Sequence, residues 1–315
     1  MERKADVVVI GGSAAGLAAA ITSRRHYPNK TVLVLRREDK VLIPCGIPYI
    51  FGTVGSPDKN LIPDAILEKN DVDLLKTEVK GFDTTKMVVH TADGDVAYKR
   101  LVVATGSRPI TPPIKGIDKD GVFAVLKDIP YLEKLQERVK TTRRAVIVGG
   151  GFIGIEFADE LKKAGVEEVS VIECADHCLS LAYDKEFCTE MEDHLVSRGV
   201  CLKTGRKLME VTGNGKVEGV TLDDGQTLEA DLVLLGIGAA ANAVLAKEAG
   251  LKIGPLGGVS VDRTMRTSDP NVFAAGDCAE KTAYFGGEPS ALKLASIACG
   301  EGRVAGANLF HSRRQ

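Results

Sequence analysis

Two glycine-rich turns, each at the end of a β-branched run, constrain this chain more than any other feature. The first is VVIGGSAAG at residues 8–16, and the second is VIVGGGFIG at residues 146–154. Each turn opens an apolar, helix-forming stretch, the context in which a helix N-terminus binds a dinucleotide pyrophosphate. Two such turns in one chain predict two bound dinucleotides, and the simplest use of such a pair is to pass electrons between them.

Length and composition fit two ordinary domains with real cores. The chain has 315 residues, 44% hydrophobic and 27% charged. Its net charge of −2 gives no support for a nucleic-acid or membrane partner. No apolar run reaches the roughly 18 residues of a spanning helix. The seven scattered cysteines, an odd number, disfavour a secreted disulfide framework, so we expect a cytoplasmic protein. The basic, alanine-rich N-terminus is interpreted as a strand and glycine turn rather than a signal peptide.

Strands and helices alternate along the chain, which predicts an α/β fold with mostly parallel sheets. In the first unit we expect a strand at 5–10, a helix at 14–26 and strands at 31–35 and 101–106. A second unit starts near residue 145 and repeats the layout, with a helix ending near 165 and strands at 169–172 and 232–238. A further strand is expected at 271–277, where it runs into a polar turn.

The two glycine turns differ at the position that normally binds a ribose. A dinucleotide fold places a carboxylate about 20 residues past the last glycine. Glu173 lies 19 residues after Gly154, and its charge predicts a preference for NADH over NADPH. In the first unit the same position reads Arg36-Arg37, with Glu38 as the nearest acid. The first site is therefore either unusual or binds the ribose of its dinucleotide less tightly.

With Ala104-Thr105-Gly106 and Ala275-Gly276-Asp277 added in the right order, the chain resembles the pyridine nucleotide–disulfide oxidoreductases over essentially its whole length. The resemblance implies two Rossmann-like domains, with an NAD(H)-binding domain at 113–242 inserted into a discontinuous FAD-binding domain at 1–112 and 243–315. It implies non-covalent FAD and NADH as cofactors. Gly106 and Gly276 also suit a close backbone approach to a ligand.

The resemblance also implies which residues contact each cofactor. Those expected at FAD are Gly11, Ser13, Ala14, Ala15, Gly16, Arg36, Arg37, Pro44, Ala104, Thr105, Gly106, Gly276, Asp277, Leu294 and Ala295. Those expected at NADH are Gly149, Gly150, Gly151, Phe152, Ile153, Gly154, Glu156, Glu173, Gly236, Ile237 and Gly238.

The segment IPCGIPY at 43–49 is similar to the single-cysteine branch of that family. The other branch carries a second cysteine five positions later, where this chain has Ile50. Cys45, the expected catalytic residue, can then accept electrons only as a sulfenic acid, a persulfide or a mixed disulfide. A helix beginning at Cys45 is expected to lower the pKa of its thiol.

Two further positions separate the members of this branch. Its oxidases and peroxidases carry a histidine where this chain has Ala14. Arg24 and Arg25 resemble the basic patch for the phosphates of coenzyme A, although a solvated helix end is the alternative. We therefore expect an NADH-oxidising reductase that acts on a small disulfide, persulfide or polysulfide. The alternatives are an NADH oxidase, a reductase of a partner protein, and a non-catalytic NADH sensor.

Two further sequence features concern a possible metal site and the C-terminal end of the chain. Cys174, His177, Cys178 and Cys188 cluster in sequence, but their spacing matches no standard zinc or iron–sulfur pattern, so no metal is expected. The family usually continues into a C-terminal dimerisation domain, whereas this sequence ends at Gln315. We expect either a trimmed chain or a short relative, and a homodimer if the full protein carries that domain.

Overall fold

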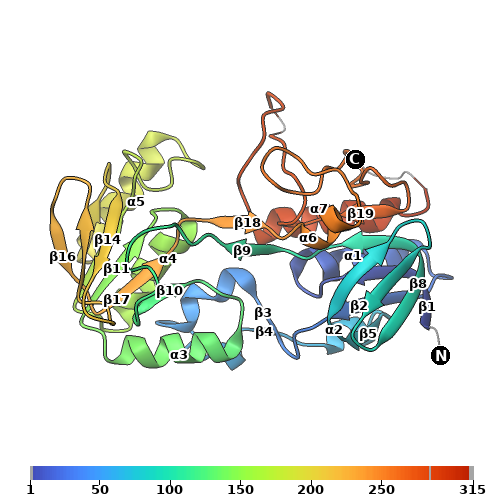
Figure 1. The fold of residues 1–315 in the computed structure, drawn as a ribbon, viewed down its shortest axis with the longest axis horizontal. Coiled ribbons are helices and arrows are strands. Elements are labelled where there is room, and N and C mark those ends of the chain that lie inside the picture. The colour runs from blue at the N-terminus through green and yellow to red at the C-terminus, as the bar shows by residue number, and fades with distance from the viewer. Residues whose placement is uncertain (1–2, 284, 312–315) are drawn as a thin grey trace. The chain divides into compact units, whose positions relative to one another are not determined.

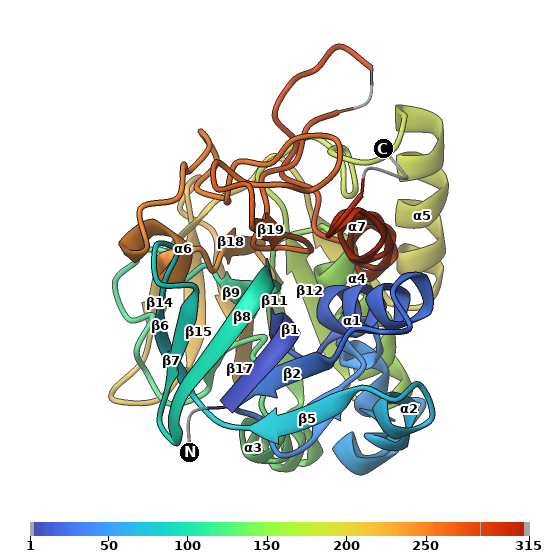
Figure 2. The same cartoon turned by 90° about the vertical axis from the view of Figure 1, so that its right-hand side faces the viewer.

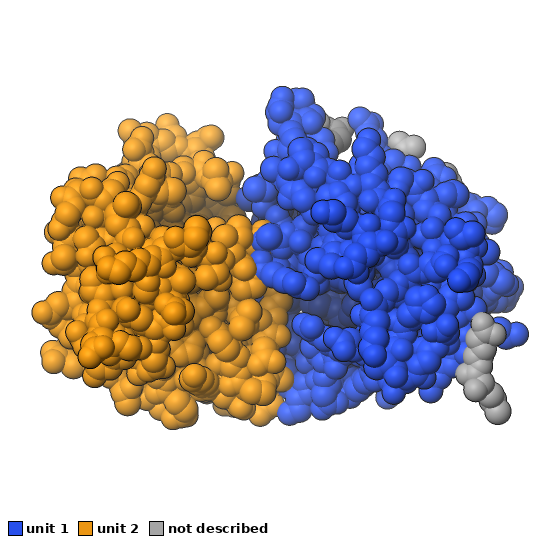
Figure 3. All heavy atoms as spheres, viewed as in Figure 1, with its two compact units in different colours: residues 1–45, 61–108, 240–315 blue, residues 46–60, 109–239 orange. Residues whose placement is uncertain are grey.

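The computed structural model describes residues 3–283 and 285–311, which form two compact units (Figures 1 and 3). Unit 1 comprises Met1–Cys45, Leu61–Arg108 and Ala240–Gln315, and unit 2 comprises Gly46–Asn60 and Pro109–Ala239. Within the described ranges, no helix is long and apolar enough to cross a membrane.

Unit 1 is built on a seven-stranded sheet with the order β5-β2-β1-β8-β7-β6, and β19 also pairs with β8. Strands β5, β2, β1, β8 and β19 run parallel, while β6 and β7 add an antiparallel hairpin to β8. The bounds are β1 Arg3–Ile10, β2 Val32–Arg36, β5 Asp73–Lys76, β6 Val79–Asp83, β7 Val88–Thr91, β8 Gly94–Val103 and β19 Val272–Ala274.

Alternation along β1 supplies both faces of this sheet. Val7 and Val9 point into the core shared with helices α1 (Ala14–His26) and α7 (Ala295–Asn308). Val8 and Ile10 point into the opposite core, which short helix α6 (Val244–Glu248) helps to cover. Figure 2 shows α1 and α7 side by side. They can approach closely because a Cβ at Gly302 or Gly306 would clash with a backbone carbonyl of α1.

Unit 2 repeats the doubly wound layout with a five-stranded parallel sheet of order β10-β17-β11-β12-β13. Helix α4 packs against β11 and β12, and α5 packs against β13, while the antiparallel strands β14–β16 share a core with β11 and β17. The bounds are β10 Val122–Ala124, α3 Ile129–Lys140, β11 Arg144–Val148, α4 Phe152–Lys163, β12 Glu168–Ile172, α5 Lys185–Ser197, β13 Val200–Lys203, β14 Leu208–Thr212, β15 Gly219–Leu222, β16 Thr227–Glu229 and β17 Leu232–Leu235.

Short elements complete the chain. Strand β3 (Val41–Leu42) pairs with β4 (Leu61–Ile62), and β9 (Ser107–Pro109) pairs with β18 (Ala239–Ala241). Helix α2 covers Ala65–Glu68, and single 3-10 turns occupy Pro44–Gly46, Pro48–Ile50 and Pro57–Lys59.

One segment departs from the predicted domain bounds. Residues 46–60 lie inside the expected FAD domain of 1–112, yet they belong to unit 2. Phe51 packs on Phe157 of α4 with ring centroids 5.2 Å apart, and Thr53 Oγ1 donates to Glu160 Oε1 at 2.8 Å. Gln136 of α3 donates to the Gly55 carbonyl at 2.9 Å. These tertiary contacts, which leave no mark on the local sequence, assign the segment to unit 2.

Candidate active site

The first glycine turn lies where the sheet of unit 1 changes winding direction. The carboxyl ends of β1, β8 and β19 carry Gly11, Ala104–Gly106 and Gly276–Asp277, respectively. Ligands of doubly wound folds bind at this edge. Gly11 has a φ of 111°, and a Cβ there would clash with the carbonyl of Ala104. A Cβ at Gly16 would clash with the carbonyl of Gly11.

The N-terminus of α1 is open to an anion. Within the described chain the Ser13 side chain makes no capping hydrogen bond, and the first turn holds no acidic residue. The first amides of a helix have no partner inside the helix and carry partial positive charge. Ala14 and Ala15 are small enough to let a phosphate approach them. This loop therefore fits the pyrophosphate of FAD.

Thr105, Ser107 and Asp277 are fixed by hydrogen bonds within unit 1. Thr105 Oγ1 donates to the Asn242 carbonyl at 2.6 Å, and Asn242 Nδ2 donates to the Thr105 carbonyl at 3.1 Å. Ser107 Oγ donates to Asp277 Oδ2 at 2.7 Å. Asn242 and Ser107 belong to no motif, so sequence reasoning missed both positioning residues.

A buried ion pair holds the turn at Gly276. Glu301 Oε2 accepts from the Gly276 amide at 2.8 Å and from Lys281 Nζ at 2.8 Å. Lys281 Nζ also donates to the Gly276 carbonyl at 2.6 Å. The Lys281 and Glu301 side chains are only 8% and 15% exposed. Both peptide groups of Gly276 are thus bound, which fixes the backbone that presents Asp277.

We expect Lys281→Met to lower the free energy of unfolding of unit 1 by about 3–5 kcal/mol, because it leaves the Glu301 charge buried without its partner. Urea unfolding measures the change. The double variant Lys281→Met, Glu301→Gln recovers part of the loss, since glutamine keeps an acceptor for the Gly276 amide. Lys252→Met, at an exposed position, is the control. A single variant as stable as the parent contradicts this role.

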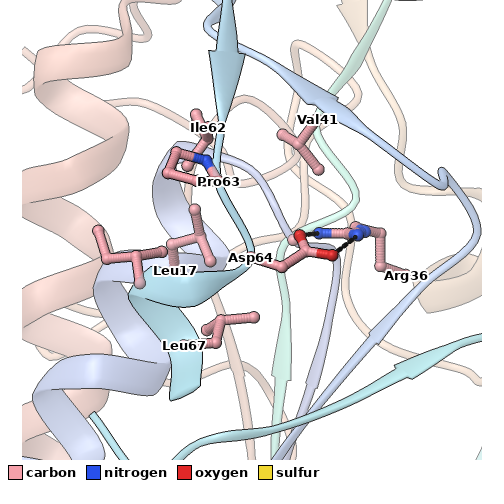
Figure 4. A pocket seen from close by; sticks show the side chains of 9 residues that line it. Leu17, Arg36, Val41, Ile62, Pro63, Asp64 and Leu67 are labelled. Carbon is pink, nitrogen blue, oxygen red and sulfur yellow. Dashed lines mark hydrogen bonds and ion pairs between the residues drawn. The ribbon is translucent and has the colours of Figure 1, made fainter. Parts of the chain in front are cut away.

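The remaining residues predicted at FAD take different places. Arg37 is exposed and pairs with Glu38. Leu294 is the N-cap of α7, which Ala295 begins. Arg36 is buried in unit 1 and pairs with Asp64, and both line a small pocket with Gly12, Leu17, Val41 and Leu67 (Figure 4).

The second glycine turn repeats this geometry within unit 2. Gly149 has a φ of 105°, and a Cβ there would lie 2.6 Å from the Gly236 carbonyl oxygen. A Cβ at Gly154 would clash with the Gly149 carbonyl. Gly236, Ile237 and Gly238 follow the end of β17, so the three predicted groups of this site converge at the ends of β11, β12 and β17.

Gly151 is the N-cap of α4 and has no side chain. The N-terminus of this helix is therefore accessible to a second pyrophosphate. Phe152 and Ile153 open the helix, where Ile153 is exposed and the Phe152 ring packs on Tyr183 with centroids 5.9 Å apart. Glu173 follows β12, and its carboxylate accepts from the amides of Gly150 at 2.5 Å and Ala175 at 2.7 Å.

We expect NADH to be favoured over NADPH by about tenfold or more in kcat/KM, because the Glu173 carboxylate repels a 2′-phosphate. Arg206 is the nearby cation, and its guanidinium is paired with Asp224 at 2.7 Å. Steady-state kinetics with both coenzymes measures the ratio. Glu173→Gln should reduce it, whereas Glu168→Gln, at the exposed start of β12, should not. Equal kcat/KM values in the parent would remove Glu173 from this role.

Glu156 lies on α4 near two other ionisable groups of unit 2. Burial, and next the charge of Glu160, raise the pKa of Glu156. The negative charge of Glu156 in turn raises the pKa of Tyr49. Glu160 is 1% exposed and its Oε1 accepts from Lys163 Nζ at 2.7 Å. Glu156 can thus hold a proton at higher pH than an ordinary glutamate.

Cys45 is an exposed free thiol in the 3-10 turn Pro44–Gly46. The helix expected to begin at Cys45 forms only as that single 3-10 turn. A second single 3-10 turn covers Pro48–Ile50, because Pro48 lacks the amide hydrogen that would continue one helix through both turns. A single 3-10 turn does not present the N-terminus of an α-helix to the Cys45 sulfur. Ile50, at the position of the second cysteine in the other branch, is fully buried.

The surroundings of three other cysteines raise the pKa values of their thiols. Burial raises the pKa of Cys178 to about 12 and also raises that of Cys278. The hydrogen bond to Glu173 raises the pKa of Cys174. Raised pKa values keep these thiols protonated, and the thiolate is the nucleophile.

The sequence cluster around Cys178 has a structural role. Its Sγ packs beneath the glycine turn, where a Cβ at Gly150 would lie 2.6 Å away. Glu192 accepts from the Cys178 amide at 2.7 Å and lies 3.1 Å from His177 Nδ1. Among the described residues, no group of three or more candidate ligands could hold a metal ion.

Arg24 and Arg25 lie at the end of α1 and contact the loop at residues 70–71. Arg24 Nε donates to the Asp71 carbonyl at 3.1 Å, and Arg25 Nη2 donates to Asn70 Oδ1 at 3.3 Å. The binding of coenzyme A phosphates by these two side chains stays a prediction.

Comparison with known proteins identifies the class. The family model for pyridine nucleotide-disulphide oxidoreductases matches residues 5–302, and the chain belongs to this family. It is 33% identical to an NADH oxidase of Methanocaldococcus jannaschii, over 96% of this chain and 69% of the relative. It is 35% identical to an NAD(P)H coenzyme A polysulfide/persulfide reductase of Pyrococcus horikoshii, over 97% of this chain and 70% of the relative.

Among solved structures, an NAD-dependent persulfide reductase from A. fulgidus matches with a TM-score of 0.89 and 34% identity, over 98% of this chain. The chain spans 59% of that protein's length. The predicted family, the α/β fold with two Rossmann-like domains, the oxidoreductase class and the cofactors FAD and NADH are confirmed.

Proposed function

We propose that this chain is an NADH-oxidising reductase in which non-covalently bound FAD passes electrons to Cys45 and on to a small persulfide, polysulfide or disulfide. The observation that carries this proposal is the exposed Cys45 thiol in a Pro-Cys-Gly turn, with buried Ile50 where a resolving cysteine would stand. Bound FAD supplies two-electron transfer from NADH to sulfur.

The steps at Cys45 balance as follows. The Cys45 thiolate attacks one sulfur of R–S–S–R′, so that a Cys45 S–S bond forms and R′S⁻ leaves. Two electrons from NADH then cleave this bond, which restores the thiolate and releases RS⁻. The net reaction consumes one NADH, one proton and one disulfide, and yields NAD⁺, RSH and R′SH.

Reduction of oxygen is the second candidate, because a relative at 33% identity is an NADH oxidase. Ala14 stands where a histidine is expected in oxidases and peroxidases, which favours the sulfur reaction. We further propose a cytoplasmic location, since all seven cysteines are free thiols in the described structure, and a homodimer if the full protein carries the C-terminal domain.

An acceptor screen with the purified protein tests the proposal. NADH oxidation is measured with coenzyme A persulfide, polysulfide, coenzyme A disulfide, or oxygen alone. We expect a sulfur acceptor to give the fastest turnover under anaerobic conditions. Turnover that requires oxygen and ignores all three sulfur compounds would identify an oxidase instead.

A further inference from the structure

The two units place equivalent residues against the second glycine of each turn. In unit 2, a Cβ at Gly150 would lie 3.0 Å from Glu173 Cβ. In unit 1, a Cβ at Gly12 would lie 2.7 Å from Arg36 Cδ. Arg36 ends β2 as Glu173 follows β12, so Arg36 occupies the position where a dinucleotide fold normally presents its ribose-binding carboxylate.

Arg36 brings a carboxylate to this position from elsewhere in the chain. Its Nη1 lies 2.7 Å from Asp64 Oδ1, and its Nη2 lies 3.0 Å from Asp64 Oδ2, a bidentate pair that Figure 4 shows. The Arg36 side chain is 1% exposed, whereas that of Asp64 is 34% exposed. The hydrogen bonds from Arg36 lower the pKa of Asp64, so its carboxylate is ionised at neutral pH.

Hydrogen-bond capacity remains on both partners. Arg36 has five N–H donors, and four make bonds, since Nε also donates to the Glu38 carbonyl and Nη2 to the Asp39 carbonyl. Among the described residues, nothing accepts from the second Nη1 hydrogen. A carboxylate has about four acceptor sites. Asp64 uses two for Arg36 and one for Lys76 Nζ at 3.3 Å, so one is left.

We propose that Asp64 is the ribose-binding carboxylate of the FAD site and that Arg36 is the residue that positions it. Each hydroxyl of a ribose diol both donates and accepts, which matches the acceptor left on Asp64 and the donor left on Arg36. Asp64 and Arg36 line one small pocket together with Gly12 of the FAD turn. This inference rests on the proposed function of unit 1 as the FAD-binding unit.

The experiment compares two ligands of the apoprotein by quenching of flavin fluorescence. One is FAD, and the other is FAD whose adenosine ribose lacks both the 2′- and 3′-hydroxyls. We expect the parent to bind FAD at least about tenfold more tightly, because loss of the diol removes its hydrogen bonds to the Asp64 carboxylate and to the buried Arg36 guanidinium. In Asp64→Ala the ratio should fall close to one. Asp39→Asn keeps the Asp39 carbonyl that Arg36 uses and should keep the parent ratio.

The ratio separates binding from a merely structural ion pair. If Asp64 only supports the fold, Asp64→Ala weakens both ligands equally, and the unchanged ratio overturns the inference. Should Asp64→Ala fail to fold, the double variant Arg36→Met, Asp64→Leu replaces the pair with apolar groups of similar size, which proteins often tolerate. A parent-like ratio in that variant also overturns the inference. A folded parent that binds neither ligand would instead contradict the proposed function itself.

Discussion

Cys45→Ser is expected to abolish reduction of sulfur acceptors, by about a thousandfold or more, as loss of a nucleophile does in other enzymes. A serine hydroxyl does not ionise near neutral pH and cannot form the S–S bond that the proposed cycle requires. FAD binding and hydride transfer from NADH should stay within about twofold of the parent, because neither uses the thiol. Rapid-mixing spectra of the flavin measure the first half-reaction, and steady-state NADH oxidation measures the whole cycle.

Cys201→Ser is the matched control, since Cys201 is another exposed thiol and belongs to β13 rather than to either glycine turn. It should turn over like the parent. Persulfide turnover at the parent rate in Cys45→Ser would make the cysteine structural and would favour electron transfer to a partner protein.

Gly11→Ala is expected to lower the affinity for FAD by about a hundredfold or more, or to prevent unit 1 from folding. The φ of 111° already costs an alanine about 1–2 kcal/mol. In addition, its Cβ would clash with the Ala104 carbonyl, which cannot move away easily because the Ala104 amide donates to the Ile10 carbonyl at 2.8 Å. Flavin content after purification and urea unfolding measure the two effects.

Gly94→Ala separates strain from the clash. Gly94 has a φ of 110°, nearly that of Gly11, but no atom lies within 4 Å of a Cβ placed there in the described chain. This control should lose about 1–2 kcal/mol of stability and keep its FAD. If Gly11→Ala retains flavin as well as Gly94→Ala does, the first turn does not cradle the pyrophosphate as proposed.

Local signals predicted the nucleotide loops and their neighbouring elements. The helix expected at 14–26 forms over Ala14–His26, because a glycine turn precedes it and Pro28 follows it closely. The same reasoning was less successful at Cys45, where Pro48, visible in the sequence, limits the chain to single 3-10 turns.

Residues that act through distant partners could not be predicted in the same way. Lys281 and Glu301 stand 20 positions apart, and neither belongs to a motif. The sequence indicated Asp64 only indirectly. An arginine at position 36, where this fold normally has an acid, requires a hydrogen-bond acceptor from another segment. Gly302 and Gly306 form a clearer sequence pattern, because glycines four residues apart on one face of a helix predict a closely packed helix neighbour.

The packing of residues 46–60 on unit 2 has a consequence for how this protein folds. Phe51 and Thr53 find their partners, Phe157 and Glu160, more than 100 residues later in the chain. During synthesis this segment must therefore wait until α4 has emerged, and such long-range closure slows folding. A fragment cut at 109–239 would leave Phe157 and Glu160 uncovered, so unit 2 cannot be excised intact as one continuous piece. In native-state hydrogen exchange, the amides of 46–60 should open together with those of α4 rather than with those of β1.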